Sequence, residues 1–239
     1  MSPKFLSACQ TNVGLRRKAN EDNYLDRSND GIWIVADGMG GHDAGEVASA
    51  MIIEAMRGIS AGPDPKRTAQ AAMDAIQAVQ VELVELARDG VKPRTIGSTV
   101  VGLVIASGQY VCFWVGDSRI LLVRDGAITR LTRDHSLVQD LIDAGLLAPA
   151  DAEAHPDSNV ITRAVGADKE LVIDSASGTV KQGDLFLLAS DGVTKVMAEE
   201  EMLQLLSTRN AKQATSIMGE MILERGAPDN FTSIVVRIL

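Results

Sequence analysis

The sequence predicts an α+β fold whose sheets are built from antiparallel strands. Four short apolar segments follow one another with only brief turns between them, at 97–106, 110–115, 120–123 and 128–131. Connections this short join antiparallel strands, because parallel strands need a long crossover. Two longer segments, 45–59 and 66–88, repeat apolar residues at helical spacing instead. The sheet is therefore not expected to be the parallel sheet of a doubly wound nucleotide-binding fold.

The elements in the first part of the chain follow from the same patterns. A first strand is expected at 4–8 and a second at 32–36, where the run of apolar residues stops at Asp37 and a glycine-rich turn. A helix starts at Gly45 and is broken by the Gly and Pro residues around position 63. The second helix, 66–88, carries its apolar residues along one face.

The remaining elements continue the alternation of strands and helices. Residues 137–144 predict a short helix, and the polar, irregular stretch after it indicates a mobile flap at about 136–160. Strands are expected at 171–180 and at 184–189, the second of which ends at Asp191-Gly192. Two helices follow, the second at 211–225, and the last strand is expected at 232–238.

Composition bounds the class of protein. The chain has 239 residues with a hydrophobic fraction of 46%, which can fill a sizeable core. No Pro/Ser-rich linker divides it, so we expect a single domain over 1–239 and, by default, a monomer. The net charge is −9 and the only basic cluster is 16–18, which argues against nucleic acid and anionic membranes as partners.

Other features indicate a cytoplasmic protein. No apolar run approaches the roughly 20 residues of a membrane helix, and the N-terminus lacks the pattern of a signal peptide. Only two cysteines occur, Cys9 and Cys112, both in strand-like segments. Buried free thiols are typical of a reducing compartment.

Four aspartates share one kind of setting. Asp22, Asp37, Asp191 and Asp229 each lie in a turn beside an apolar strand. If the sheets bring these ends together, the carboxylates repel one another and cations must offset the repulsion. Oxygen ligands favour Mg²⁺ or Mn²⁺, and the three scattered histidines offer no zinc-site spacing.

A pair of such ions, ~4 Å apart, can catalyse hydrolysis, because it activates a bridging water and holds phosphoryl oxygens. Arg17 lies upstream of the acidic pair Glu21-Asp22. Its guanidinium can form two hydrogen bonds to a phosphate and neutralise charge in the transition state. The alternative is a solvated loop whose charges pair with one another.

An ordered series of short motifs resembles one family. The motifs are Arg17-Lys18-Ala19-Asn20-Glu21-Asp22, Asp37-Gly38-Met39-Gly40-Gly41-His42, Gly97-Ser98-Thr99, Gly116-Asp117-Ser118-Arg119, Ile161-Thr162-Arg163-Ala164-Val165-Gly166, Ser190-Asp191-Gly192 and Asp229-Asn230. Each motif alone is weak, but the order is specific. The chain is similar to the type 2C metal-dependent serine/threonine phosphatases in their compact bacterial form.

The resemblance implies a four-layer α/β/β/α sandwich of two stacked antiparallel sheets flanked by helices. It implies that phosphoserine and phosphothreonine on proteins are hydrolysed by direct attack of a water that bridges two Mn²⁺ or Mg²⁺ ions. The enzyme would oppose a bacterial Ser/Thr protein kinase, and the flap would influence substrate choice.

The resemblance also implies roles for individual residues. Asp37 would bridge the two metals, and the Gly38 carbonyl would be a ligand. Asp191 and Asp229 would complete one metal, and Arg17 would bind the substrate phosphate. Glu21 and Asp22 would act directly or through waters.

Two further assignments depend on the resemblance. Asp117 would help to hold a third, weaker metal, although the Gly-Asp-Ser-Arg turn can also be a plain hairpin with an Asp–Arg pair. Some relatives carry a general-acid histidine two residues after the bridging aspartate, where this chain has Met39. Leaving-group protonation then falls to His42 or to a metal-bound water. The alternative role of His42 is to cap the helix or pack the turn.

Two other functions compete with hydrolysis. A catalytically weak regulator of the same fold would only bind phosphoproteins, but such a protein should have lost metal carboxylates, and none of the expected ones is missing. A nucleotide-binding protein would use the glycine-rich loop 38–45, yet that loop has no lysine at P-loop spacing.

Overall fold

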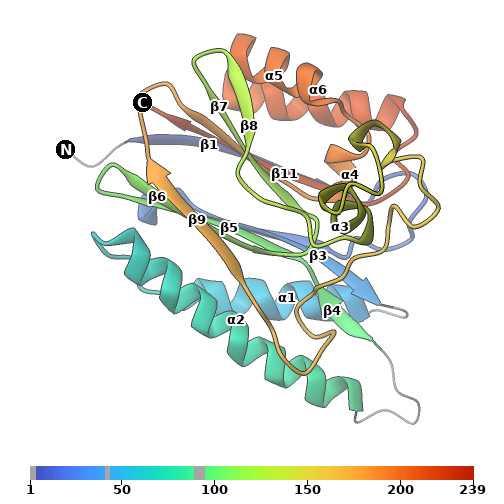
Figure 1. Ribbon diagram of the computed structural model, residues 1–239. Coiled ribbons are helices and arrows are strands. Elements are labelled where there is room, and N and C mark those ends of the chain that lie inside the picture. Colours follow the sequence, from blue (N-terminus) through green and yellow to red (C-terminus); the bar gives the residue numbers. More distant parts are fainter. Residues whose placement is uncertain (1–3, 41–43, 89–94) are drawn as a thin grey trace.

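Two antiparallel sheets stack face to face and helices cover both outer faces, as Figure 1 shows for the computed structural model. The structure describes residues 4–40, 44–88 and 95–239. Apolar side chains fill three layers: one between the sheets and one under each pair of helices. The predicted α+β class and four-layer sandwich are therefore confirmed.

One sheet has the strand order β1-β11-β10-β7-β8, and every neighbouring pair is antiparallel. Its strands are β1 (Phe5–Asn12), β7 (Arg119–Arg124), β8 (Ala127–Arg130), β10 (Leu185–Ala189) and β11 (Phe231–Ile238). The strand β10 is buried along its whole length because the partner sheet covers one face and helices cover the other.

The second sheet has the order β2-β3-β5-β6-β9, with a short strand β4 paired to the end of β3. Its strands are β2 (Asp22–Arg27), β3 (Ile32–Gly40), β4 (Ile96–Ser98), β5 (Val100–Ala106), β6 (Gln109–Val115) and β9 (Asp174–Thr179). Trp33 on β3 and Phe186 on β10 are completely buried between the two sheets.

Helices form the outer layers (Figure 1). The longer ones are α1 (Ala44–Arg57) and α2 (Pro65–Arg88) on one side, and α5 (Glu199–Thr208) and α6 (Ala211–Glu224) on the other. The single turn α4 (Asp191–Thr194) follows β10 directly, a feature that the sequence did not predict. Among the described helices, none combines the length and the apolar character needed to cross a bilayer.

Three local expectations were wrong. The strand from residue 32 does not stop at Asp37, because β4 supplies hydrogen-bond partners for Gly38 to Gly40. Asp22 does not lie in a turn, because it begins the strand β2. The turn at Gly116 is not a hairpin: β6 and β7 belong to different sheets, and the turn carries the chain from one sheet to the other.

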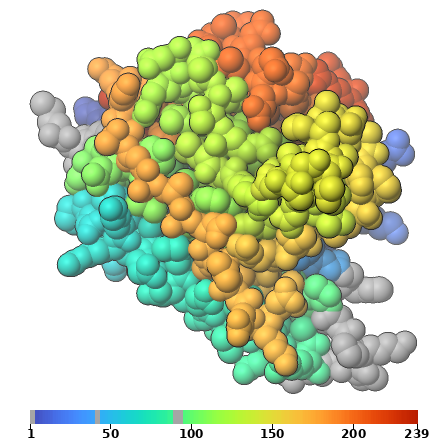
Figure 2. Space-filling model, viewed as in Figure 1, coloured from blue at the N-terminus to red at the C-terminus, as the bar shows by residue number. Residues whose placement is uncertain are grey.

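The flap lies on the surface beside these sheets. It begins with α3 (Leu137–Asp143) and contains the 3₁₀ turn η2 (Pro149–Asp151). Figure 2 shows the yellow atoms around residue 150 bulging from the face of the molecule. A β-bridge between Ser136 and Ile161 closes the base of the flap.

The stability of the sandwich should depend on the layer between the sheets. Phe186→Ala removes a fully buried ring that makes an edge contact with Tyr110, with the two ring centroids 5.2 Å apart. The resulting cavity should lower the free energy of unfolding by about 3–5 kcal/mol, measured by denaturant titration. Leu6→Ala, at an exposed position of the same sheet, is the control and should change it by less than about 0.5 kcal/mol. Equal losses in both variants would contradict this assignment of the core.

Candidate active site

The pairing of β2 with β3 places the first two aspartates opposite each other. Asp22 and Asp37 are direct cross-strand partners in this antiparallel pair. Directly opposite residues project to the same face of a sheet, so the register alone brings the two side chains together. Asp37 also has its backbone held from the other side, where the Thr99 N–H donates to the Asp37 carbonyl at 2.8 Å and the Ser98 hydroxyl at 2.9 Å.

The other sheet, β1-β11-β10-β7-β8, delivers three more carboxylates to the same place. Asp191 follows β10 and Asp229 precedes β11, and the ladder between these two strands continues in the bond from Ser190 N–H to the Thr232 carbonyl. Asp117 lies just before β7, whose first residue pairs with the last residue of β10. The three side chains therefore come from neighbouring strand ends on the same side of this sheet.

These residues line one pocket of about 300 Å³. Of the predicted site residues, the pocket includes Arg17, Glu21, Asp37, Gly38, Asp117, Asp191 and Asp229. Asp22 is buried and its Oδ2 accepts a hydrogen bond from Ser190, next to Asp191. His42 lies outside the described residues. Position 38 requires a glycine, because the backbone there approaches Gly45 so closely that a Cβ would collide with the Gly45 carbonyl.

Crowding and burial change the acidity of these groups. Burial is the main cause that raises the pKa of Asp22 to about 7, with Asp191 and Asp229 adding to it, while hydroxyls of Ser190 and Thr232 oppose the shift. Burial and neighbouring carboxylates raise the pKa of Asp117 to about 6. The pKa of Asp37 is also well above its usual range, first because of burial and then because of Asp22 and Asp191. The site thus holds more negative charge than its own side chains neutralise.

Two cations partly offset that charge. The Arg17 guanidinium donates to Asp229 at 2.6 Å, a contact between residues at opposite ends of the chain, so the alternative of a loop that pairs only with itself does not hold for Arg17. The Lys195 ammonium lies 2.6 Å from Asp191 and 3.6 Å from Asp117. Arg119 instead pairs with Asp134, which removes the alternative of a hairpin with an Asp–Arg pair at Asp117.

The donor set fits hard divalent ions. One oxygen of Asp22, Oδ1, is buried and has no hydrogen-bond partner, which is costly unless a ligand satisfies it. The other available donors are carboxylate oxygens and the backbone of Gly38, the ligands that Mg²⁺ and Mn²⁺ prefer. Within the described residues, no three acidic, His or Cys side chains already surround one ion position. Arg17 and Lys195 each contact a carboxylate oxygen at this site.

Ser190 and Asn230 belong to the motifs that resemble the family, and they support the site although the sequence assigned them no role. The Ser190 hydroxyl, fully buried, donates to Asp22 at 2.8 Å. Asn230 accepts the N–H of Glu21 and donates to the carbonyls of Val13 and Ala19, which fastens the loop that carries Arg17. Their positions beside Asp191 and Asp229 were the available signal, but hydrogen bonds between distant segments are not visible in a sequence.

Two histidines, His135 and His155, lie in the described residues, and both make structural contacts. His135 is almost fully buried, stacks on Trp114, and accepts the Gly116 N–H at Nδ1. His155 accepts the N–H of Asp157 within the flap.

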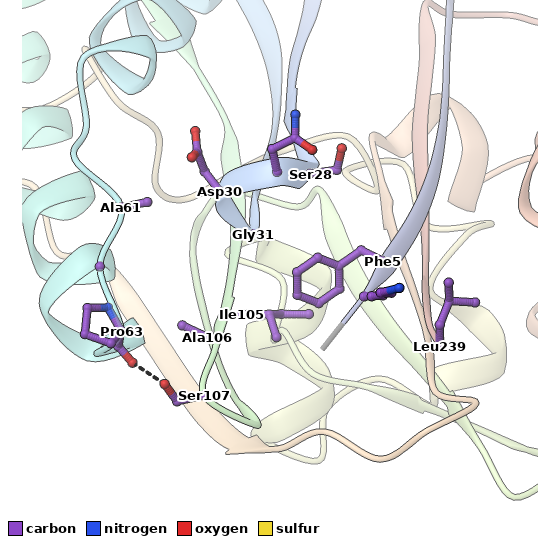
Figure 3. A pocket seen from close by; sticks show the side chains of 13 residues that line it. Phe5, Ser28, Asp30, Gly31, Ala61, Pro63, Ile105, Ala106, Ser107 and Leu239 are labelled. Carbon is purple, nitrogen blue, oxygen red and sulfur yellow. Dashed lines mark hydrogen bonds between the residues drawn. The ribbon is translucent and has the colours of Figure 1, made fainter. Parts of the chain in front are cut away.

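A second pocket, of about 610 Å³, lies at the ends of β3, β5 and β11 that are opposite to the carboxylates (Figure 3). Phe5, Gly31, Ile105 and Leu239 line it, and the Ser107 hydroxyl donates to the Pro63 carbonyl there at 2.7 Å. It contains none of the predicted site residues.

Comparison with known proteins identifies the family. Residues 16–221 match the protein phosphatase 2C family, so the chain belongs to that family. The predicted enzyme class, a protein-serine/threonine phosphatase that depends on divalent metal, is thereby confirmed.

Individual relatives agree in sequence and in structure. The serine/threonine phosphatase stp of Listeria monocytogenes is 34% identical over 235 residues, which is 95% of this chain and 93% of the relative. The structure of PppA, described as a key regulatory component of T6SS in Pseudomonas aeruginosa, superposes with a TM-score of 0.91 at 37% identity and covers 100% of both chains. The catalytic domain of the phosphatase PstP, solved in complex with 2 manganese ions, gives a TM-score of 0.87 at 30% identity, again with 100% of both chains covered.

The raised pKa of Asp22 predicts that this residue makes a pH-dependent contribution to the stability of chelator-treated protein. The folded state holds a proton on Asp22 from its ordinary pKa of 3.8 up to about 7, whereas the unfolded state has lost it, so this contribution to stability falls as the pH rises through that window. Asp22→Asn removes the contribution. Its stability relative to the wild type should therefore grow from about pH 4 to about pH 7 in urea unfolding.

The comparison with the wild type is needed because His135, whose pKa burial lowers, acts in the opposite sense. Asp125→Asn, in an exposed hairpin, is the matched control for the change of Asp to Asn itself. A difference between Asp22→Asn and the wild type that stays constant with pH would show that Asp22 carries no extra proton in the folded state.

Proposed function

We propose that this phosphatase hydrolyses phosphoserine and phosphothreonine on proteins at the carboxylate pocket, with two Mn²⁺ or Mg²⁺ ions as cofactors. The observation that carries the proposal is the convergence of five aspartates, namely Asp22, Asp37, Asp117, Asp191 and Asp229, around one pocket with an orphaned buried oxygen on Asp22. So much uncompensated charge is expensive to fold unless ions bind it. The PstP structure with 2 manganese ions supports the same number.

Particular residues would hold these ions. Asp37 would contact both, Asp191 and Asp229 would complete one, and the Gly38 carbonyl would be a further ligand. Glu21 and Asp22 would act directly or through waters. When bound, the ions supply activation of a water nucleophile and neutralisation of phosphoryl charge.

Arg17 would bind the substrate phosphate. Its side chain is about half exposed at the mouth of the pocket. A guanidinium has five N–H donors, so its contact with Asp229 leaves others for phosphate oxygens. Burial of the guanidinium is slight, and its hydrogen bond to Asp229 is the main cause that raises the Arg17 pKa, so it is cationic at any physiological pH.

The remaining assignments are proposals of the same kind. His42, or a water, would protonate the leaving group, and the flap would select substrates. The chain would act as a single catalytic domain and a monomer in the cytoplasm, opposing a Ser/Thr protein kinase. The description of PppA as a regulatory component supports a signalling role.

Loss of a metal carboxylate should abolish turnover without unfolding the chain. Asp37→Asn and Asp191→Asn should each lower kcat by about 10²-fold or more on a phosphothreonine peptide with Mn²⁺, because the ions lose a ligand. Chelator should abolish wild-type activity. Asp125→Asn should retain full rate, and circular dichroism should match for all variants. Full activity of Asp37→Asn would refute the site, and an inactive wild type that still binds the phosphopeptide would favour the non-catalytic regulator.

Removal of the Arg17 side chain should act mainly on substrate binding. Arg17→Ala should raise KM for the same peptide while kcat changes little, since it removes ground-state contacts with the phosphate. The neighbouring exposed Arg16 provides the matched control, and Arg16→Ala should leave both constants near the wild-type values. An unchanged KM in Arg17→Ala would reject the proposed role.

A further inference from the structure

The carboxylates of Asp117 and Asp191 are joined by a cation that belongs to the chain. Lys195 Nζ lies 2.6 Å from Asp191 Oδ2 and 3.6 Å from Asp117 Oδ2. A lysine is cationic at neutral pH, so an ammonium lies between these two carboxylates.

Local structure places this ammonium. Lys195 is four residues after Asp191 and follows the single turn α4, where its N–H donates to the Asp191 carbonyl at 2.8 Å. Residues four apart lie on the same face of a helical turn, so the lysine side chain reaches back over Asp191. The turn itself is fixed against the start of β11, because Gly192 packs on the Asn230 carbonyl too closely for any side chain.

The same ammonium also contacts the flap. Lys195 Nζ donates to the side-chain oxygen of Asn159 at 2.8 Å. Asn159 and Asp117 line both the catalytic pocket and a neighbouring pocket of about 360 Å³ under the flap. Lys195 thus links three segments that are far apart in the chain, at the boundary between these two pockets.

We infer that the Lys195 ammonium takes the place of a third divalent ion between Asp117 and Asp191 and fastens the flap to the catalytic pocket. An ion held by both carboxylates would lie about 2.1 Å from an oxygen of each. Those oxygens already face the ammonium, and a divalent charge beside it would be strongly repelled. The inference rests on the proposed two-ion function and departs from the prediction that Asp117 helps to hold a third ion.

The first test counts bound manganese by equilibrium dialysis followed by elemental analysis. Wild-type protein should bind about two Mn²⁺ per chain, and Lys195→Met should bind about three, because it frees both carboxylates at similar side-chain length. Lys195→Arg keeps the charge and should stay near two. Lys181→Met, at an exposed lysine, is the control for a lost surface charge and should also stay near two.

The outcomes separate the two proposals. About three ions in the wild type, or about two in Lys195→Met, would overturn the role of Lys195 and leave the proposed function standing. No bound manganese in the wild type would overturn both. If Lys195→Met is unstable, Lys195→Gln provides a second variant, and about three ions in the wild type would still overturn the inference.

A second readout tests the contact with the flap. In Lys195→Met, backbone amides in the flap should exchange with deuterium several-fold faster than in the wild type, while those in β3 and β10 should be unchanged. Flap exchange equal to that of the wild type and of Lys181→Met would overturn this part of the inference.

Discussion

Mutual repulsion among buried carboxylates is the constraint on which this molecule depends. The sandwich brings Asp22, Asp37, Asp117 and Asp191 within electrostatic reach of one another, and burial raises the pKa of the first three. A protein stores such repulsion only where a ligand relieves it. The two internal cations, Arg17 and Lys195, relieve it unequally: one is half exposed at the mouth of the pocket, and the other joins two carboxylates and the flap.

Much of the fold and site could be predicted because the informative residues lie next to strand ends. The apolar runs before Asp37 and Asp191 gave both strands and both aspartates, and the antiparallel class followed from the short turns after Ser107 and Asp125. The segment 22–27 is mostly polar and does not by itself predict a strand. Only its pairing with β3 makes it a strand, and such pairing depends on distant residues.

What the sequence concealed was which sheet each strand joins and which charges meet. The turn at Gly116 has the composition of a hairpin, yet it carries the chain from one sheet to the other and thereby places Asp117 at the pocket. Nothing in the sequence distinguishes Lys195 from the other lysines, and only the turn α4 places it over Asp191. Arg17 and Asp229 are at opposite ends of the sequence, and only the closed sandwich makes them neighbours.

The cross-strand partnership of Asp22 and Asp37 has a consequence for how the protein matures. Strand pairing changes only in whole-residue steps, and one step turns a side chain to the other face of the sheet. A chain that pairs β2 with β3 in a shifted register would therefore have no active site at all. Recovery of catalysis after denaturation would count only the molecules with the native alignment, and so would measure the accuracy of refolding directly.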